Sequence, residues 1–173
     1  KYLGTKGQET TVGIKESTAF VKDFQLLCAN CGKDIKMPLV LYELGKWDLM
    51  ASDGINSKDS LEYLYDILTE NQTIIIELAA HTDTRGNDKA NQILSQKRAE
   101  TCVSYLIEKG IDPERMVPVG YGESKPIISD AQIAAMTSEQ EREAGHAKNR
   151  RTVFQVLSFD FIPKAEPASG GSN

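Results

Sequence analysis

The stretch that most constrains the fold runs from residue 74 to residue 111, IIIELAAHTDTRGNDKANQILSQKRAETCVSYLIEKGI. Its first residues are apolar on both faces except for Glu77, which is typical of a central strand covered by helices on at least one side. A polar loop follows, and from about residue 89 to residue 109 apolar side chains recur at helical spacing. Gly110 then suits the left-handed conformation in which many helices end. The sequence thus predicts a buried strand, a polar loop and a long amphipathic helix, with the rest of the chain built around them.

The loop of this unit presents an acid near a base. The predicted strand ends in His81, Thr82 and Asp83, and the helix that follows carries Asn91 and Arg98. In α/β sheets, ligands tend to bind where the ends of strands meet the starts of helices. We therefore expect a binding site at the loop that contains Asp83.

The flanking segments predict further strands and helices. A stripe of apolar residues at three- and four-residue spacing indicates a helix between Ser57, as its cap, and Asn71. Further strands are predicted at residues 37–42, 116–119 and 152–159, with a short exposed helix within residues 129–148 that begins at Thr137 or Ser138. This alternation, with helical crossovers that favour parallel neighbours, predicts an α/β two-layer sandwich of the type βαβαβ-(α)-β, in which helices back one sheet.

Chain length limits the number of domains, because 173 residues allow one good-sized core and a fragment of a second domain. We expect one folded domain at residues 37–162. Residues 1–36 are predicted to be either an extension that packs on this domain or the remnant of an upstream domain. Residues 163–173 are rich in Pro, Gly and Ser, which predicts a disordered tail.

Composition and charge argue against several classes of protein. The formal net charge is −5, and no basic run with interleaved aromatic residues occurs, so a nucleic-acid partner is not expected. The apolar runs are too short to span a bilayer, and the chain opens without a hydrophobic signal region. We expect any export signal or lipid anchor to have been removed or to lie outside this sequence.

The cysteines do not predict a metal centre. Cys28 and Cys31 form a lone Cys-x-x-Cys, a spacing that permits a disulfide, a redox pair or half of a zinc site. The remaining candidate ligands are scattered without the spacing of a zinc finger. We expect no metal and no cofactor, and the redox state of the two cysteines stays open.

The residue types used in acyl transfer are present but lack the required context. His81 and Asp83 lie near Ser95, yet neither a nucleophile elbow nor an oxyanion-hole loop is evident. Paired carboxylates for glycoside hydrolysis would need Asp83 and a partner such as Glu43 or Glu123 across a cleft. We therefore expect a binding protein without catalytic residues, and keep hydrolysis as the weakest alternative.

Three motifs, in order along the chain, carry a resemblance to a known family: HTDTRGNDKANQILSQKRAETCVSYLIEKGI, then VGYGESKPI, then NRRTVF. Over about residues 37–160 the chain resembles the OmpA C-terminal family of peptidoglycan-binding domains, which outer-membrane proteins, peptidoglycan-associated lipoproteins and flagellar stator subunits share. The resemblance implies a periplasmic location, with a tether to the outer membrane through regions outside this sequence. It also implies noncovalent binding of peptidoglycan at the meso-diaminopimelate of the peptide stem.

The resemblance further implies which side chains bind this ligand. The aspartate of the His-Thr-Asp motif is Asp83, and the arginine of the Leu-Ser-x-x-Arg-Ala motif is Arg98. One arginine of the Asn-Arg-Arg motif usually reaches the pocket, and the sequence leaves open which one does so here. Glu43 stands where the family often has an aspartate after the first strand. The full set of expected ligand-binding residues is Asp83, Arg98, Asn91, Thr82, Arg150, Arg151 and Glu43.

The chemistry of the expected ligand agrees with this assignment. The free end of diaminopimelate carries an ammonium and a carboxylate on one carbon. Asp83 can accept from the ammonium, and Arg98 can donate a two-pronged hydrogen bond to the carboxylate. In the alternative interpretation, Asp83 and Arg98 pair with each other and only fix the loop to the helix.

The expected role of such a domain is to anchor an outer-membrane protein or an envelope complex, such as a secretion or motility machine, to the cell wall. A second interpretation is a protein scaffold that docks other envelope proteins through residues 126–148 or through the N-terminal segment, without wall binding.

Overall fold

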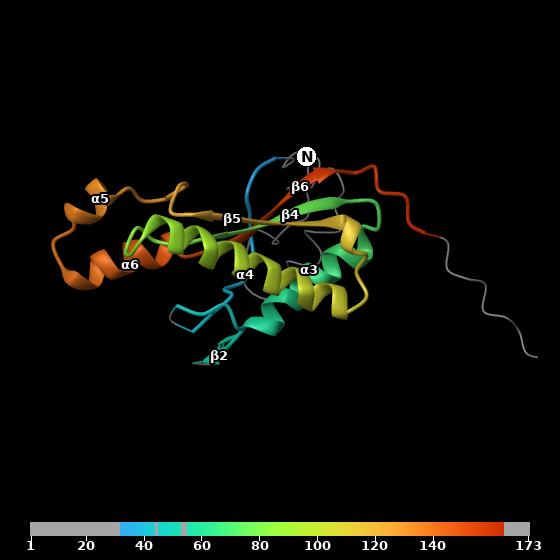
Figure 1. Cartoon of the computed structure of the whole chain (residues 1–173), viewed down its shortest axis with the longest axis horizontal. Coiled ribbons are helices and arrows are strands. Elements are labelled where there is room, and N and C mark those ends of the chain that lie inside the picture. The colour runs from blue at the N-terminus through green and yellow to red at the C-terminus, as the bar shows by residue number, and fades with distance from the viewer. Residues whose placement is uncertain (1–31, 44, 53–54, 165–173) are drawn as a thin grey trace, which may run out of the picture.

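The computed structural model describes residues 32–43, 45–52 and 55–164, and its main feature is a mixed β-sheet backed by two helices (Figure 1). Within these residues four strands form the sheet in the order β1-β6-β4-β5. Helices α3 and α4 lie against one face of it, so the predicted α/β two-layer sandwich is confirmed. The bounds are β1 Ile35–Lys36, α3 Ser57–Glu70, β4 Ile75–His81, α4 Asp88–Glu108, β5 Met116–Gly122 and β6 Thr152–Ser158. A separate two-stranded sheet pairs β2, Ala51–Ser52, with β3, Ile55–Asn56.

The core lies between the central strand β4 and the two helices. Ile76 and Leu78 of β4 are fully buried, as is Phe154, which lies opposite Leu78 on β6. The predicted apolar stripe of α3 and the later part of α4 contact them. The helix residues of this core are Leu61, Tyr63, Leu64, Ile67 and Leu68 of α3, and Cys102, Val103 and Leu106 of α4. The expectation that β4 is central and covered by helices is confirmed, although Ile93, predicted on the core side of α4, is 62% exposed.

The directions of the strands correct one expectation. β4 and β5 are parallel, as expected for strands joined by the crossover helix α4, but β6 is antiparallel to β4. The chain between β5 and β6 forms α5, Asp130–Ala134, and α6, Glu139–Asn149, and α5 was not predicted. Both helices lie beyond the end of the sheet where β5 ends (Figure 1). Because the chain does not cross back over the sheet, β6 starts at that end and runs in the opposite direction.

Helix α4 packs unusually close to the edge strand β5. A Cβ atom on Gly120 would lie 2.2 Å from the backbone N of Gln96, so only glycine fits there. The Gln96 side chain donates to the carbonyl of Pro118 and accepts from the N–H of Gly120, and Ser95 Oγ accepts from the N–H of Gly122. Side chains of α4 therefore satisfy polar groups of β5 that would otherwise lie free at a sheet edge.

The prediction of a strand at residues 37–42 is wrong. Within this segment only Tyr42 makes a β-bridge, to Leu49. Its backbone groups instead bond to hydroxyls at the start of α3: Ser57 Oγ accepts from the N–H of Leu41 and also contacts its carbonyl, and Ser60 Oγ donates to the carbonyl of Leu39. Because Ser57 is used in this way, Asn56 takes the predicted capping role and accepts from the N–H of Lys58.

Other expectations concern the ends of the folded domain. Ile35 pairs with Phe154, so the sheet includes residues that precede the predicted domain start at residue 37. The boundaries of the domain stay a prediction. The expectations for Cys28 and Cys31, for the first 31 residues and for the tail from residue 165 concern parts of the chain outside the described residues. Among those that are described, no helix is both long and apolar enough to cross a membrane.

Candidate ligand-binding site

Asp83 lies immediately beyond the carboxyl end of the central strand. The strand pairing reaches the last residue of β4 on one side, where the N–H of His81 donates to the carbonyl of Arg151, and passes it on the other, where the N–H of Thr82 donates to that of Gly122. The loop after β4 is thus held between β5 and β6 up to residue 82. Asp83 follows directly, and the residue is only 6% exposed.

The loop that carries Asp83 is fixed to the first turn of α4. Asn87 caps this helix by accepting from the N–H groups of Lys89 and Ala90. The Asn91 amide lies 3.2 Å from the carbonyl oxygen of Asp83 and 3.3 Å from that of Arg85, and it donates to Glu123 across 2.7 Å. Asn91, one of the predicted site residues, is buried, and its bonds to the two carbonyl groups position the loop.

Two arginines neutralise the Asp83 carboxylate. Arg85 donates to Oδ2 from Nη2 at 2.6 Å and from Nε at 3.1 Å, while its backbone N–H donates to Oδ1. Arg150 Nη1 lies 2.6 Å from the same Oδ2. Burial alone would raise the pKa of Asp83, but the hydrogen bonds from Arg85 and Arg150 outweigh it and hold the pKa below its ordinary value.

Glu143 of α6 closes a ring of four charged residues. Its carboxylate lies 2.8 Å from Arg85 Nη1 and 2.8 Å from Arg150 Nη2. These bonds, Arg150 first and then Arg85, hold the pKa of Glu143 below its ordinary value. The ring Asp83–Arg85–Glu143–Arg150 alternates in charge and joins the loop after β4 to helix α6, which precedes β6.

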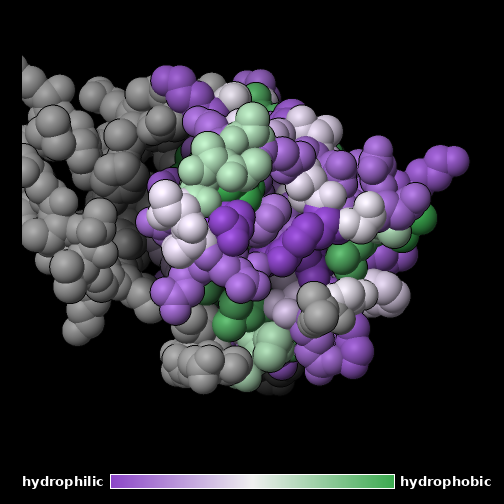
Figure 2. Space-filling model, turned by 90° about the vertical axis from the view of Figure 1, so that its left-hand side faces the viewer, coloured by the Kyte–Doolittle hydropathy of each residue, from purple (hydrophilic) through white to green (hydrophobic). Residues whose placement is uncertain are grey.

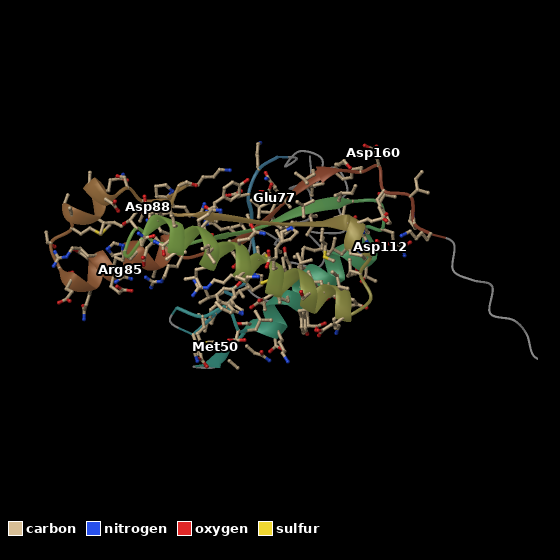
Figure 3. All side chains as sticks on the ribbon, viewed as in Figure 1. Met50, Glu77, Arg85, Asp88, Asp112 and Asp160 are labelled. Atoms are coloured by element: carbon tan, nitrogen blue, oxygen red, sulfur yellow. The ribbon has the colours of Figure 1, made fainter. Side chains whose placement is uncertain are left out.

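This ring lines a cleft of about 690 Å³. Arg85 lies at the end of the molecule where α6 is found (Figure 3). Seen from that end, strongly hydrophilic side chains occupy the middle of the surface, with hydrophobic groups above and below them (Figure 2). The charged lining consists of four arginines and two carboxylates, which gives the cleft a formal charge of +2 although the chain carries −5. These residues are Asp83, Arg85, Arg98, Glu143, Arg150 and Arg151, and the apolar lining includes Leu39, Val40, Leu41 and Leu94.

Arg98 lines the cleft but is held apart from Asp83. Its Nε donates to the carbonyl of Lys46 across 3.0 Å, and its Nη2 lies 3.4 Å from the carbonyl oxygen of Glu43. The guanidinium carbon is 4.6 Å from the centre of the Tyr42 ring. Burial lowers the pKa of Arg98, which nevertheless stays charged at neutral pH. The alternative in which Asp83 pairs with Arg98 is therefore wrong, because the carboxylate pairs with Arg85 and Arg150.

The structure distinguishes the two arginines of the Asn-Arg-Arg motif. Both line the cleft, but it is Arg150 that bonds to Asp83. Arg151 donates to the carbonyl of Lys125 across 3.1 Å and lies 3.6 Å from Asp34. Arg151 thus fixes the turn after β5, and Arg150 belongs to the charged ring.

Three further predicted or candidate residues differ in their position. Glu43 is half-exposed, its carboxylate pairs with Lys46, and it is not among the described residues that line the cleft. Thr82 and His81 do line it and are buried, with no partner for their side-chain polar atoms among the described residues. His81 stacks on the Tyr121 ring at 5.2 Å, and burial, aided by the charge of Arg151, lowers its pKa to about 4. It is therefore neutral at pH 7.

Sequence reasoning missed two members of the ring, Arg85 and Glu143. Arg85 follows Asp83 by two residues, so a signal was present in the polar loop. Glu143 gave no such signal, because it lies 60 residues after Asp83, in a charged exposed helix that contains many similar side chains. Only the return of the chain to the end of β4 brings it to the site.

An α/β sandwich with a charged cleft at the end of its central strand defines the class of domain, and comparison with known proteins defines the family. The OmpA family model matches residues 53–140, so the chain belongs to the OmpA family. This range contains Asp83, Arg85, Asn91 and Arg98, whereas Glu143 and Arg150 lie beyond it.

Curated relatives match only part of their own length. Outer membrane porin F of Pseudomonas fluorescens is 38% identical over 101 residues, which cover 58% of this chain and 28% of that protein. The peptidoglycan-associated lipoprotein of Buchnera aphidicola is 40% identical over 84 residues, which cover 49% of this chain and 42% of that protein. The chain thus spans less than half the length of these two relatives.

Solved structures share the fold. A putative MotB-like protein from Desulfovibrio vulgaris has a TM-score of 0.52 at 25% identity and covers 68% of this chain and 67% of that one. The peptidoglycan-associated lipoprotein from Burkholderia pseudomallei has a TM-score of 0.53 at 24% identity and covers 70% of this chain and 91% of that one. A cell wall anchor of the T6SS from Pseudomonas aeruginosa has a TM-score of 0.52 at 21% identity, covering 68% of this chain and 75% of that one.

Proposed function

We propose that this domain binds peptidoglycan noncovalently, through the diaminopimelate of the peptide stem, and so anchors an outer-membrane protein or envelope complex to the cell wall. One observation carries the proposal: the buried Asp83 carboxylate lies in a cleft that four arginines line, at the end of β4, in a chain that belongs to the OmpA family. The names of the relatives support it, since they include peptidoglycan-associated lipoproteins and a cell wall anchor.

The chemistry of the cleft supports a zwitterionic, acidic ligand. In the proposed complex Asp83 accepts from the ligand ammonium, and Arg98 donates to the carboxylate on the same carbon. Each charge-assisted bond contributes about 1.5–3 kcal/mol where water is partly excluded. Affinity for a single stem is then modest, and the repeating wall supplies avidity.

The proposal places the domain in the periplasm and assigns it a holding role, without bond breakage. Arg150 takes part through its bond to Asp83, and Thr82 through its place in the cleft lining. Asn91 acts by fixing the loop. A contact from Glu43 would require its side chain to leave Lys46, so we assign it the weakest role of the expected residues.

Co-sedimentation with purified, protein-free sacculi tests the proposal. The wild type should pellet, and Asp83→Asn and Arg98→Ala should pellet at least tenfold less. Asp66→Asn on the exposed side of α3 and Lys97→Ala, whose side chain pairs with Glu100 at the surface, are the matched controls and should behave as wild type. Equal pelleting of all five proteins would refute the proposed site. Release of soluble muropeptides over time would refute the holding role and favour hydrolysis.

A further inference from the structure

We propose that the outer nitrogens of Arg85 and Arg150 form a subsite for a second carboxylate of the ligand, and that Glu143 occupies this subsite in the free protein. The inference rests on the proposed function, because it concerns an acidic peptide bound in the same cleft. It adds Arg85 to the expected contacts, gives Arg150 a direct contact with the ligand, and identifies Glu143 as an internal competitor.

The two arginines are oriented as a carboxylate-binding pair. Asp83 Oδ2 holds Nε and Nη2 of Arg85 and Nη1 of Arg150. This leaves Arg85 Nη1 and Arg150 Nη2 directed at Glu143, one toward each of its two oxygens and each at 2.8 Å. Two N–H donors on the two oxygens of one carboxylate is a favourable arrangement for charge-assisted hydrogen bonds. The structure thus contains a filled carboxylate site whose occupant belongs to the chain itself.

The occupant is exchangeable, whereas the arginines are anchored. The Asp83 side chain is 8% exposed, so its bonds to the arginines are sheltered from water. The Glu143 side chain is 51% exposed, and exposed ion pairs contribute little to stability. A ligand carboxylate can therefore replace Glu143 while Asp83 keeps both arginines in place.

The subsite is separate from the one assigned to Arg98. Arg98 bonds to the carbonyl groups of Lys46 and Glu43 and contacts the Tyr42 ring, outside the ring of four charges. The cleft therefore offers two places for carboxylates, and its formal charge of +2 is retained while Glu143 is in place. A stem peptide that ends in diaminopimelate and carries a further free carboxylate can fill both places. An amino acid with a single carboxylate can fill only one of them.

Removing the competitor should strengthen binding. Calorimetric titration with the soluble stem tripeptide L-Ala-γ-D-Glu-meso-diaminopimelate is the measurement. Glu143→Gln should bind about three- to tenfold more tightly than the wild type, the size expected when one exposed ion-pair competitor is lost. Glu139→Gln is the matched control, because it removes the same charge from the exposed start of the same helix, and it should bind as the wild type does. Adding Arg85→Gln to Glu143→Gln should abolish the gain.

A carboxyl NMR titration tests the ion pairs of Glu143 directly. The midpoint of Glu143 should lie below its ordinary value in the free wild type and should rise in Arg85→Gln, which needs no ligand, and also on saturation of the wild type with the tripeptide. If the wild type binds the tripeptide but Glu143→Gln binds equally or more weakly, the inference is overturned and the proposed function stands. If no variant binds the tripeptide or sacculi, the proposed function fails, and the second subsite fails with it.

Discussion

The Arg150 guanidinium donates to Asp83 across 2.6 Å and so joins residues that are 67 positions apart in the sequence. Asp83 follows the central strand β4 and Arg150 precedes β6, which pairs with β4. Because the two strands are antiparallel neighbours, the exit from one and the entry to the other meet at the same end of the sheet. The His-Thr-Asp and Asn-Arg-Arg motifs therefore form one site.

Asp83→Asn should weaken the fold as well as the binding. The amide cannot neutralise Arg85 and Arg150, so among the described residues Glu143 would remain as the counter-charge of two partly shielded guanidinium groups. We expect a loss of about 1–3 kcal/mol in the free energy of unfolding, measured by urea titration. Asp66→Asn on α3 should change it by less than about 0.5 kcal/mol. A loss no larger than that of the control would contradict the sheltered ion pairs.

The contribution of Asp83 should depend on pH in a defined window. Its pKa in the folded protein is lower than the ordinary value of 3.8, so the folded state favours the charged form. The stabilisation is then fully present above about pH 4 and is lost as the pH falls through the lowered pKa. The difference in unfolding free energy between wild type and Asp83→Asn should stay constant from pH 7 to about pH 4.5 and shrink below pH 4. Shrinkage that begins near pH 6 would argue against this assignment.

His81 should produce a separate acid sensitivity at higher pH. Its pKa falls from the ordinary 6.5 to about 4 because it is buried and near Arg151, so the folded state favours the neutral ring. The unfolded chain takes up the proton first, and stability should decline by about 1–3 kcal/mol between pH 6.5 and pH 4. His81→Phe keeps a ring to stack on Tyr121 and should lose this decline, whereas His146→Gln should keep it. An identical pH profile for wild type and His81→Phe would refute the prediction.

The sequence predicted the central part of the fold because most local signals there agree with the global arrangement, with the exposed Ile93 of α4 as an exception. The apolar run of β4, the periodicity of α4 and the left-handed Gly110 all indicate the same elements that the structure shows. Residues 37–42 gave the opposite result. Their apolar composition is that of a strand, but Ser57 and Ser60 satisfy their backbone groups, and no local pattern encodes such long-range bonds.

The sequence predicted those cleft residues that belong to a recognisable motif. It did not predict which of these residues pair with one another, or that Glu143 of α6 joins them. Asp83, Arg98 and the two arginines of the Asn-Arg-Arg motif all line the cleft. Their pairing could not be read from the sequence, because it depends on how α6 returns to the end of β4. That return places Glu143 and Arg150 against the loop, whereas Arg98 bonds to the backbone carbonyls of Lys46 and Glu43.

Gly120→Ala should disrupt the contact between α4 and β5. The added methyl group would lie 2.2 Å from the N and 2.5 Å from the Cα of Gln96, and both are backbone atoms that cannot rotate away. We expect a loss of about 1–3 kcal/mol, measured by thermal or urea unfolding, because the helix must shift from the strand. Val117→Ala on the same strand, where the side chain is 43% exposed, is the control and should cost less. A stability equal to that of the wild type would show that α4 moves without penalty.

Asn149→Ala should separate positioning of the arginines from general stability. The fully buried Asn149 accepts from the N–H groups of Ile127 and Ile128 and donates to the carbonyl of Ile128, so the segment before α5 is tied to the residue just before Arg150. Its removal leaves these backbone groups without their partner and should cost about 1–3 kcal/mol.

The decisive comparison for Asn149 is with an unrelated loss of stability. Asn56→Ala removes the cap of α3 at a partly exposed position and should cost about 1 kcal/mol. Measured at a temperature where both variants remain folded, pelleting with sacculi should fall severalfold for Asn149→Ala and stay at the wild-type level for Asn56→Ala. The reason is that Asn149 lies next to Arg150 in the chain and Arg150 bonds to Asp83. We therefore expect Asn149→Ala to weaken binding and Asn56→Ala to leave it unchanged. Equal binding by the two variants would mean that Asn149 acts on stability without placing the arginine.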